Sequence, residues 1–146
     1  MSEAKTKYAL GIDLGTTFSS VSIMLSGKVE IVADKLRLKA IPSIVNFAKK
    51  KDDDQLNIAV GGYGQKRLAA DPKNTIYDTK RMLAQQYEDE NIQKMIPKWP
   101  FSIEKNETGG ISICLDNIDK KFEPYEISSE ILKYLAEVGN SRLPTE

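Results

Sequence analysis

Three strand patterns follow one another at the start of the sequence, with no helix pattern between them. Large apolar residues occupy every second position over residues 8–14, and the alternation resumes over residues 19–25. Ser26-Gly27 is a hairpin turn signal, and residues 29–32 have the pattern of a third strand. The chain is therefore expected to open as a meander of consecutive strands, which differs from the strict β-α-β alternation of a doubly wound sheet.

A short bend joins the first two strand patterns. Gly15 lets the backbone approach a ligand closely or adopt a positive φ, and the Thr16 and Thr17 hydroxyls add donors to the backbone N–H groups. Asp13 would repel a phosphate in direct contact, so its presence makes sense if Mg²⁺ and its waters lie between them. A plain Gly-Thr turn capped by Asp13 is the structural alternative, and these residues alone leave both open.

Mixed strands and helices are expected after the meander. Short strands at residues 44–47 and 57–60 flank a charged loop at 49–54, and Gly61-Gly62 ends the second strand. From Tyr63 to Tyr87 the apolar residues, Ile76 among them, indicate helical segments broken at Asp71-Pro72.

The last third is expected to contain one more short helix, a hairpin and the longest helix. The short helix covers residues 88–95, and the hairpin pairs residues 101–105 with 111–115. The long amphipathic helix starts at Glu123-Pro124, and Gly139-Asn140 is a signal for its C-cap. The whole pattern predicts a mixed α/β protein.

Composition removes several classes of chemistry. The 146 residues include no histidine and a single cysteine, Cys114, which excludes Ser-His-Asp triads, Cys-His pairs and the usual zinc sites. Lysine and arginine number 21, as do aspartate and glutamate, so charge gives no reason to expect nucleic acid or membrane partners. The start lacks a signal-peptide pattern, which favours a cytoplasmic location. Carboxylates, hydroxyls, lysines and amides remain, and they suit phosphate and magnesium handling.

Taken together, the motifs resemble those of the seventy-kilodalton heat-shock protein (heat shock protein 70) chaperone family. Residues 12–19, which contain the bend, are similar to the first signature of that family. Similar segments follow in the same order at residues 29–33, 41–47, 74–82, 99–101 and 124–129. The resemblance covers nearly the whole chain.

The resemblance implies an actin-like (ribonuclease H-like) ATPase fold that is incomplete. The chain would contain the first part of subdomain IA and most of subdomain IB, as an N-terminal fragment of a longer domain. The implied division is an opening meander of lobe I at about 1–38, a subdomain IB region at about 39–123, and a helix returning to lobe I at about 124–140.

The resemblance also implies a site for ATP or ADP with Mg²⁺. Asp13 matches the family's aspartate that organises Mg²⁺ through water. Lys66 aligns, through Gly62-x-x-x-Lys66, with the catalytic lysine near the γ-phosphate. The first phosphate loop is matched by Gly15, Thr16, Thr17 and Phe18.

The implied full-length protein hydrolyses ATP to drive the binding and release of unfolded polypeptides, with J-domain co-chaperones and nucleotide exchange factors as partners. The fragment alone is expected to be inactive and to self-associate through exposed apolar faces. Three departures leave hydrolysis in question: Ala40 and Ile41 replace hydroxyl residues, and Tyr63 replaces an acid. Two alternatives stay open, a sugar kinase of the same superfold and a chaperone-like regulatory platform that does not hydrolyse ATP.

Overall fold

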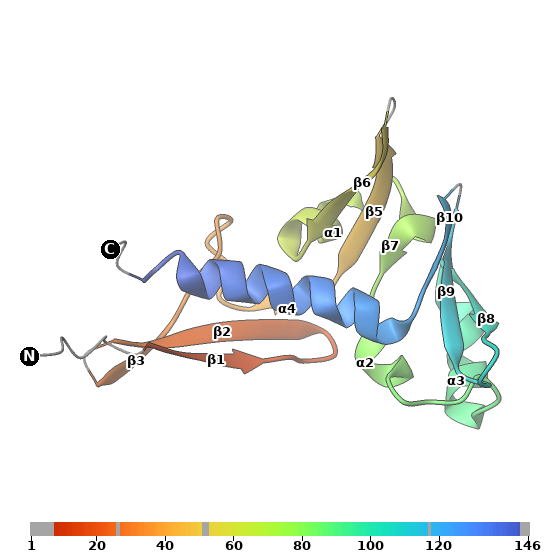
Figure 1. Ribbon diagram of the computed structural model, residues 1–146, viewed down its shortest axis with the longest axis horizontal. Helices are drawn as coiled ribbons and strands as arrows, with labels where there is room; N and C mark the ends of the chain where they lie inside the picture. The colour runs from red at the N-terminus through yellow and green to blue at the C-terminus, as the bar shows by residue number, and fades with distance from the viewer. Residues whose placement is uncertain (1–7, 26, 51–52, 117, 144–146) are drawn as a thin grey trace, which may run out of the picture.

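The computed structural model describes residues 8–25, 27–50, 53–116 and 118–143, and within them three antiparallel sheets lie against one long helix (Figure 1). The first sheet is a meander of β1 (Ala9–Asp13), β2 (Phe18–Leu25) and β3 (Lys28–Ile31), as the alternating pattern predicts. A two-residue strand, β4 (Ile41–Pro42), pairs with the start of β2. Of the predicted Ser26-Gly27 turn, Ser26 lies outside the described residues, and Gly27 has a φ of 76°.

The second and third sheets are built mainly from hairpins. The second has the order β6-β5-β7, from β5 (Val45–Lys50), β6 (Asp53–Val60) and β7 (Thr75–Ile76). The third has the order β10-β9-β8, from β8 (Ser102–Lys105), β9 (Ile111–Leu115) and β10 (Ile118–Phe122). The charged segment 49–54 belongs to the β5–β6 hairpin rather than to a separate loop, and residues 51–52 lie outside the description.

Three short helices and two 3₁₀ turns connect these strands. They are α1 (Gly62–Arg67), a turn at Pro72–Asn74, α2 (Thr79–Met82), α3 (Glu90–Met95) and a turn at Ile96–Lys98. The helical prediction for Ile76 is wrong, because Ile76 pairs with Val45 as a fully buried strand residue. The helix also stops at Met82 instead of continuing to Tyr87, since the backbone turns left-handed at Ala84 with a φ of 57°.

The helix α4 (Pro124–Asn140) packs on the first sheet and extends to the second and third (Figure 1). Its predicted apolar stripe is confirmed, because Ile127, Ile131, Leu135 and Val138 are all buried. Gly139 does not act as a cap, since the helix runs through Asn140 and Ser141 follows as its C-cap. A Cβ on Gly139 would lie 2.7 Å from Leu10 Cδ2, so this glycine lets the helix approach β1.

Aromatic contacts and burial show how the three sheets share a core. The centre of the Phe47 ring of β5 lies 4.7 Å from the centre of the Phe122 ring of β10, and this contact joins the second sheet to the third.

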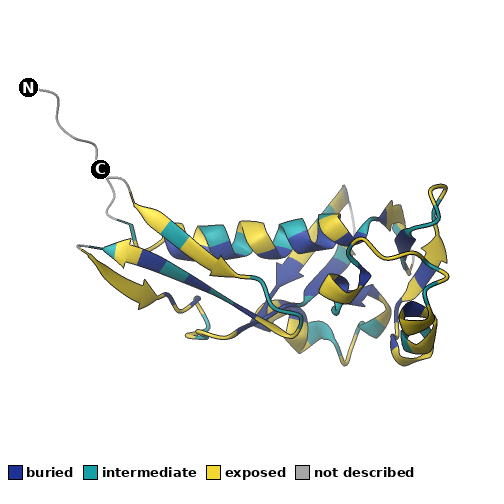
Figure 2. Ribbon diagram, turned by 90° about the horizontal axis from the view of Figure 1, so that it is seen from below, coloured by how far each residue is buried: buried dark blue, intermediate teal, exposed yellow. Residues whose placement is uncertain are grey.

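Figure 2 shows that β3 is exposed along its length, in contrast to the buried positions of β2. No helix in the described ranges is long and apolar enough to span a membrane.

Candidate functional site

The bend between β1 and β2 is tighter than an ordinary loop. Asp13 ends β1 opposite Ser20, and Phe18 begins β2 opposite Pro42. A Cβ on Gly15 would lie only 2.0 Å from the carbonyl oxygen of Phe18, and the φ of Gly15 is not positive. Glycine is therefore required here because the chain folds back onto its own backbone.

Two buried serines brace the bend from inside. The Gly15 N–H donates to Ser19 Oγ (3.2 Å), and Ser43 Oγ donates to the Gly15 carbonyl (2.8 Å). The two hydroxyl oxygens lie 2.8 Å apart, and the Ser43 N–H donates to the Thr17 carbonyl (2.9 Å). These bonds fix the path of residues 15–17 before any ligand binds.

A lysine from a distant segment completes the support of the bend. Lys80 Nζ, on α2, donates to the Leu14 carbonyl at 2.8 Å, across 66 positions of sequence. This contact brings a positive charge to the bend, where an anionic ligand would gain from it. Lys80 belongs to one of the similar segments, but its contact with the bend could not be predicted from the sequence because only the folded chain brings α2 to β1.

The outward-facing groups of the bend remain free for a ligand. Within the described residues, neither the Asp13 carboxylate nor the hydroxyls of Thr16 and Thr17 form a side-chain hydrogen bond or an ion pair. The backbone N–H groups of Thr16 and Thr17 likewise have no described backbone acceptor. Four unused donors and one exposed carboxylate at their edge suit an anion accompanied by a cation.

A small cavity of about 120 Å³ lies beside these donors. Its walls come from four separate segments, namely Thr16 and Thr17, Ser43 and Ile44, Leu68, and Tyr77 and Asp78. Asp78 is held in place by Trp99, whose Nε1 donates to its Oδ2 at 3.1 Å, and it adopts a left-handed φ of 60°. Burial, and to a smaller extent the negative charge of Asp78, raises the pKa of Tyr77, so the Tyr77 wall of the cavity presents a neutral phenol.

One carboxylate is all that the bend offers to a metal ion. In the described part of the chain, no three acidic or cysteine side chains gather as a metal-binding group. An exposed carboxylate with free oxygens fits Mg²⁺ held mainly by water and by phosphate oxygens, because Mg²⁺ retains several of its waters in proteins. The residues therefore fit the predicted contact of Asp13 with Mg²⁺ through water.

Lys66 is the predicted site residue that no described contact links to the bend. It is exposed on α1, and its Nζ lies 5.9 Å from the centre of the Tyr63 ring. Tyr63 and Arg67 line another cavity, of about 380 Å³, between α1, β6 and α4. Leu68, which directly follows α1, lines the cavity beside Thr16 and Thr17. The structure thus groups Asp13, Gly15, Thr16, Thr17 and Phe18, and none of the contacts described for Lys66 links it to them.

The three departures from the family pattern lie in β4, just before it, and in α1. Ile41 is fully buried in β4 opposite Ser19, where an apolar side chain is accommodated. Ala40 is exposed just before that strand, and Tyr63 faces α4. None of the three replaces a group that braces the bend.

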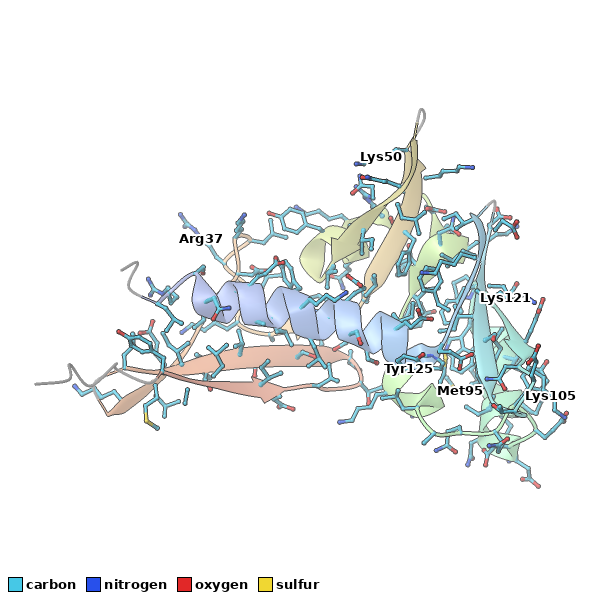
Figure 3. All side chains as sticks on the ribbon, in the orientation of Figure 1. Arg37, Lys50, Met95, Lys105, Lys121 and Tyr125 are labelled. Atoms are coloured by element: carbon cyan, nitrogen blue, oxygen red, sulfur yellow. The ribbon has the colours of Figure 1, made fainter. Side chains whose placement is uncertain are left out.

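A second polar cluster, on the third sheet, does not form a reactive site. Lys105 and Lys121 project from this sheet (Figure 3) and pair with Glu88 and Glu104 at 3.2 Å and 2.6 Å. Burial, and to a smaller extent the negative charge of Glu104, raises the pKa of the Cys114 thiol. The thiolate that nucleophilic or redox chemistry needs is therefore disfavoured.

Comparison with known proteins decides the family. A family model described as Hsp70 protein matches residues 9–146. The chain belongs to the Hsp70 family. The mixed α/β architecture with several antiparallel sheets is consistent with the nucleotide-binding domain of Hsp70 proteins, and the resemblance carried by the motifs is confirmed.

Individual Hsp70 relatives match the chain from end to end. It is 35% identical over 166 residues to a heat shock protein homologue of Encephalitozoon cuniculi, with 98% of this chain and 24% of the relative covered. It is 35% identical over 144 residues to the putative heat shock 70 kDa protein 7 of Homo sapiens, with 97% of this chain and 37% of the relative covered. It is 32% identical over 144 residues to a ribosome-associated molecular chaperone of Saccharomyces cerevisiae, with 98% of this chain and 22% of the relative covered. The chain spans between 22% and 37% of the length of these Hsp70 relatives.

Proposed function

We propose that these residues form the first phosphate-binding element of an ATP-dependent chaperone of the Hsp70 family. The observation that carries the proposal is the braced bend, whose free Thr16 and Thr17 donors lie next to the free Asp13 carboxylate. Such donors suit the β- and γ-phosphates of ATP. The carboxylate suits Mg²⁺, and Mg²⁺ neutralises phosphate charge when it is bound.

Each residue of the bend would contact a different part of the Mg²⁺-bound nucleotide. The N–H and hydroxyl groups of Thr16 and Thr17 donate to phosphate oxygens, and Gly15 keeps the turn narrow enough for a phosphate to lie against it. Asp13 accepts hydrogen bonds from metal-bound water, and Phe18, which is 51% exposed, forms the rim at the start of β2. Lys80 adds a positive charge through its contact with Leu14.

At the level of the whole protein, we propose an actin-like ATPase that couples ATP hydrolysis to the binding and release of unfolded polypeptides. J-domain co-chaperones and nucleotide exchange factors would be its partners, and the cytoplasm its compartment. The support is family membership together with relatives named as chaperones. Residues 1–146 alone would bind ATP weakly and hydrolyse it negligibly, because they span no more than 37% of these relatives.

A second function, a nucleotide-binding platform that does not hydrolyse ATP, is favoured by one observation. The contact described for the side chain of Lys66, the predicted catalytic lysine, is with the Tyr63 ring, 5.9 Å from its Nζ. Membership of the Hsp70 family leaves no ground for the sugar-kinase alternative.

ATP binding and turnover by the chain in its longest expressed form test the proposal, with the wild type beside Asp13→Asn and Lys66→Ala. Mg²⁺-dependent binding that weakens in Asp13→Asn supports the phosphate site. Turnover that collapses in Lys66→Ala would confirm the predicted catalytic lysine, whereas binding without turnover favours the platform. ATP binding that is absent, or indifferent to Asp13→Asn, would refute the proposal.

A further inference from the structure

We infer that Gln65, and not Lys66, is the side chain of α1 that contacts the bound phosphates, so that this helix offers the nucleotide a neutral amide. The inference rests on the proposed function, and it specifies the ligand contacts of that same site. It begins from the two sides of α1. Leu68, just after the helix, borders the cavity beside Thr16 and Thr17, while Tyr63 and Arg67 border the cavity beside α4.

Helix geometry places Gln65 and Lys66 relative to these two sides. Successive residues are about 100° apart, and Leu68 continues the α1 conformation with φ −55° and ψ −40°. Gln65, three residues before Leu68, therefore lies about 60° from it around the axis. Lys66, two residues before, lies about 160° away and so points almost directly opposite. The position of its Nζ over the Tyr63 ring agrees with this orientation.

Close packing prevents α1 from turning to exchange the two residues. A Cβ on Gly64 would lie 2.7 Å from the Ala59 carbonyl oxygen, and one on Gly62 would lie 2.7 Å from Leu36 Cδ1. The two glycines lie about 160° apart around the axis, so α1 is closely packed on two nearly opposite sides where larger side chains do not fit. On another face, Arg67 Nη1 donates to Asn46 Oδ1 at 3.1 Å and fixes the end of the helix.

The chemistry of the contact follows from the residue type. The Gln65 side chain is exposed, and its amide carries two donors for phosphate oxygens or for a bound water, without a charge. A lysine at this position would stabilise the charge that develops during phosphoryl transfer, whereas an amide does so far less. The site is therefore arranged to hold a nucleotide more effectively than to hydrolyse it.

Nuclear magnetic resonance of the ¹⁵N-labelled chain tests the inference, with Mg·ADP as the probe. We expect shifts at the backbone amides of Thr16 and Thr17 and at the side-chain amide of Gln65. Affinity is measured on Gln65→Ala, on Gln65→Lys and on Lys66→Ala as the matched neighbour. Gln65→Lys should bind Mg·ATP roughly tenfold more tightly, with a gain that declines in high salt, and Gln65→Ala should bind severalfold more weakly. Lys66→Ala should bind as the wild type does.

The outcomes distinguish failure of the proposed phosphate-binding function from failure of the Gln65 assignment. If Thr16 and Thr17 do not respond to Mg·ADP, the proposed function fails, and the inference fails with it. If they respond but the Gln65 side chain does not, or if Lys66→Ala loses affinity, the inference alone is overturned. All three exchanges are at exposed positions, and the spectrum of each variant reports directly whether it has kept the fold.

Discussion

Replacing Gly15 by alanine tests how the bend is built. The added Cβ would lie 2.0 Å from the Phe18 carbonyl oxygen, which belongs to the backbone of β2 and has no rotamer in which to move aside. The bend must open instead. Opening it lengthens the bond from the Gly15 N–H to Ser19 Oγ and the bond from Ser43 Oγ to the Gly15 carbonyl.

The expected cost can be assembled from these contacts. Each lost hydrogen bond is worth about 1 kcal/mol, and the displaced backbone adds strain of up to about 1 kcal/mol. We therefore expect Gly15→Ala to lower the free energy of unfolding by about 2–3 kcal/mol. For a chain of this length, that loss corresponds to a decrease in Tm of roughly 6–12 °C.

Thermal unfolding followed by circular dichroism measures this loss, with Gly11→Ala as the control. Gly11 lies in β1, two residues before Asp13, and its Cβ would meet only the Ser22 hydroxyl, a side-chain atom that can rotate away. Rotation breaks the exposed hydrogen bond from the Ser22 hydroxyl to the Gly11 carbonyl (3.3 Å), so the control should lower the free energy of unfolding by about 1 kcal/mol or less. If Gly15→Ala unfolds at the wild-type temperature, the tight turn inferred here is wrong.

Three further predictions concern other parts of the chain. Tyr134→Phe should lower the free energy of unfolding by about 1.5–2 kcal/mol, because the Asp34 carboxylate, 6% exposed, loses one of its three donors. Burial, and next the bond to Asp34, raise the pKa of Tyr134 above the unfolded value, so the wild type should lose stability above about pH 10, by up to about 1.4 kcal/mol per pH unit. Urea unfolding between pH 8 and 11 should show a shallower decline in Tyr134→Phe, and equal slopes would contradict the assignment. Ala84→Gly should raise the free energy of unfolding by about 1 kcal/mol, and the Tm with it, because left-handed strain is relieved; an unchanged Tm would show that Ala84 is unstrained. Light scattering should detect self-association through Met24, Val29 and Ile31, which are 48–66% exposed on the first sheet; a monomer at high concentration would count against it.

The elements with a strong period were predictable from the sequence. Residues 19–25 alternate, so β2 buries Ser19, Val21 and Ile23 on one face. Residues 127–138 repeat at helical spacing, so α4 buries one stripe. The two-residue strands β4 and β7 could not be predicted this way, because two residues are too short for any period, and only pairing across the chain defines them.

The site shows a second limit of sequence reasoning. The bend itself could be predicted, because its residues are contiguous, but its braces Ser43 and Lys80 join it from distant segments. A motif also carries no information on rotation around a helix, where one step in alignment turns a side chain by about 100°. Gly139 illustrates the same point, since a typical cap residue serves here to admit Leu10.

The central claim is that the bend binds phosphate together with Mg²⁺, and calorimetric titration of ATP into the chain tests it most directly. The wild type and Asp13→Asn would each be titrated with Mg²⁺ present and with Mg²⁺ chelated. The account predicts that the wild type binds more tightly with Mg²⁺, by about tenfold or more, and that Asp13→Asn loses most of this advantage. Equal affinity with and without Mg²⁺, or an undiminished Mg²⁺ effect in Asp13→Asn, would contradict it.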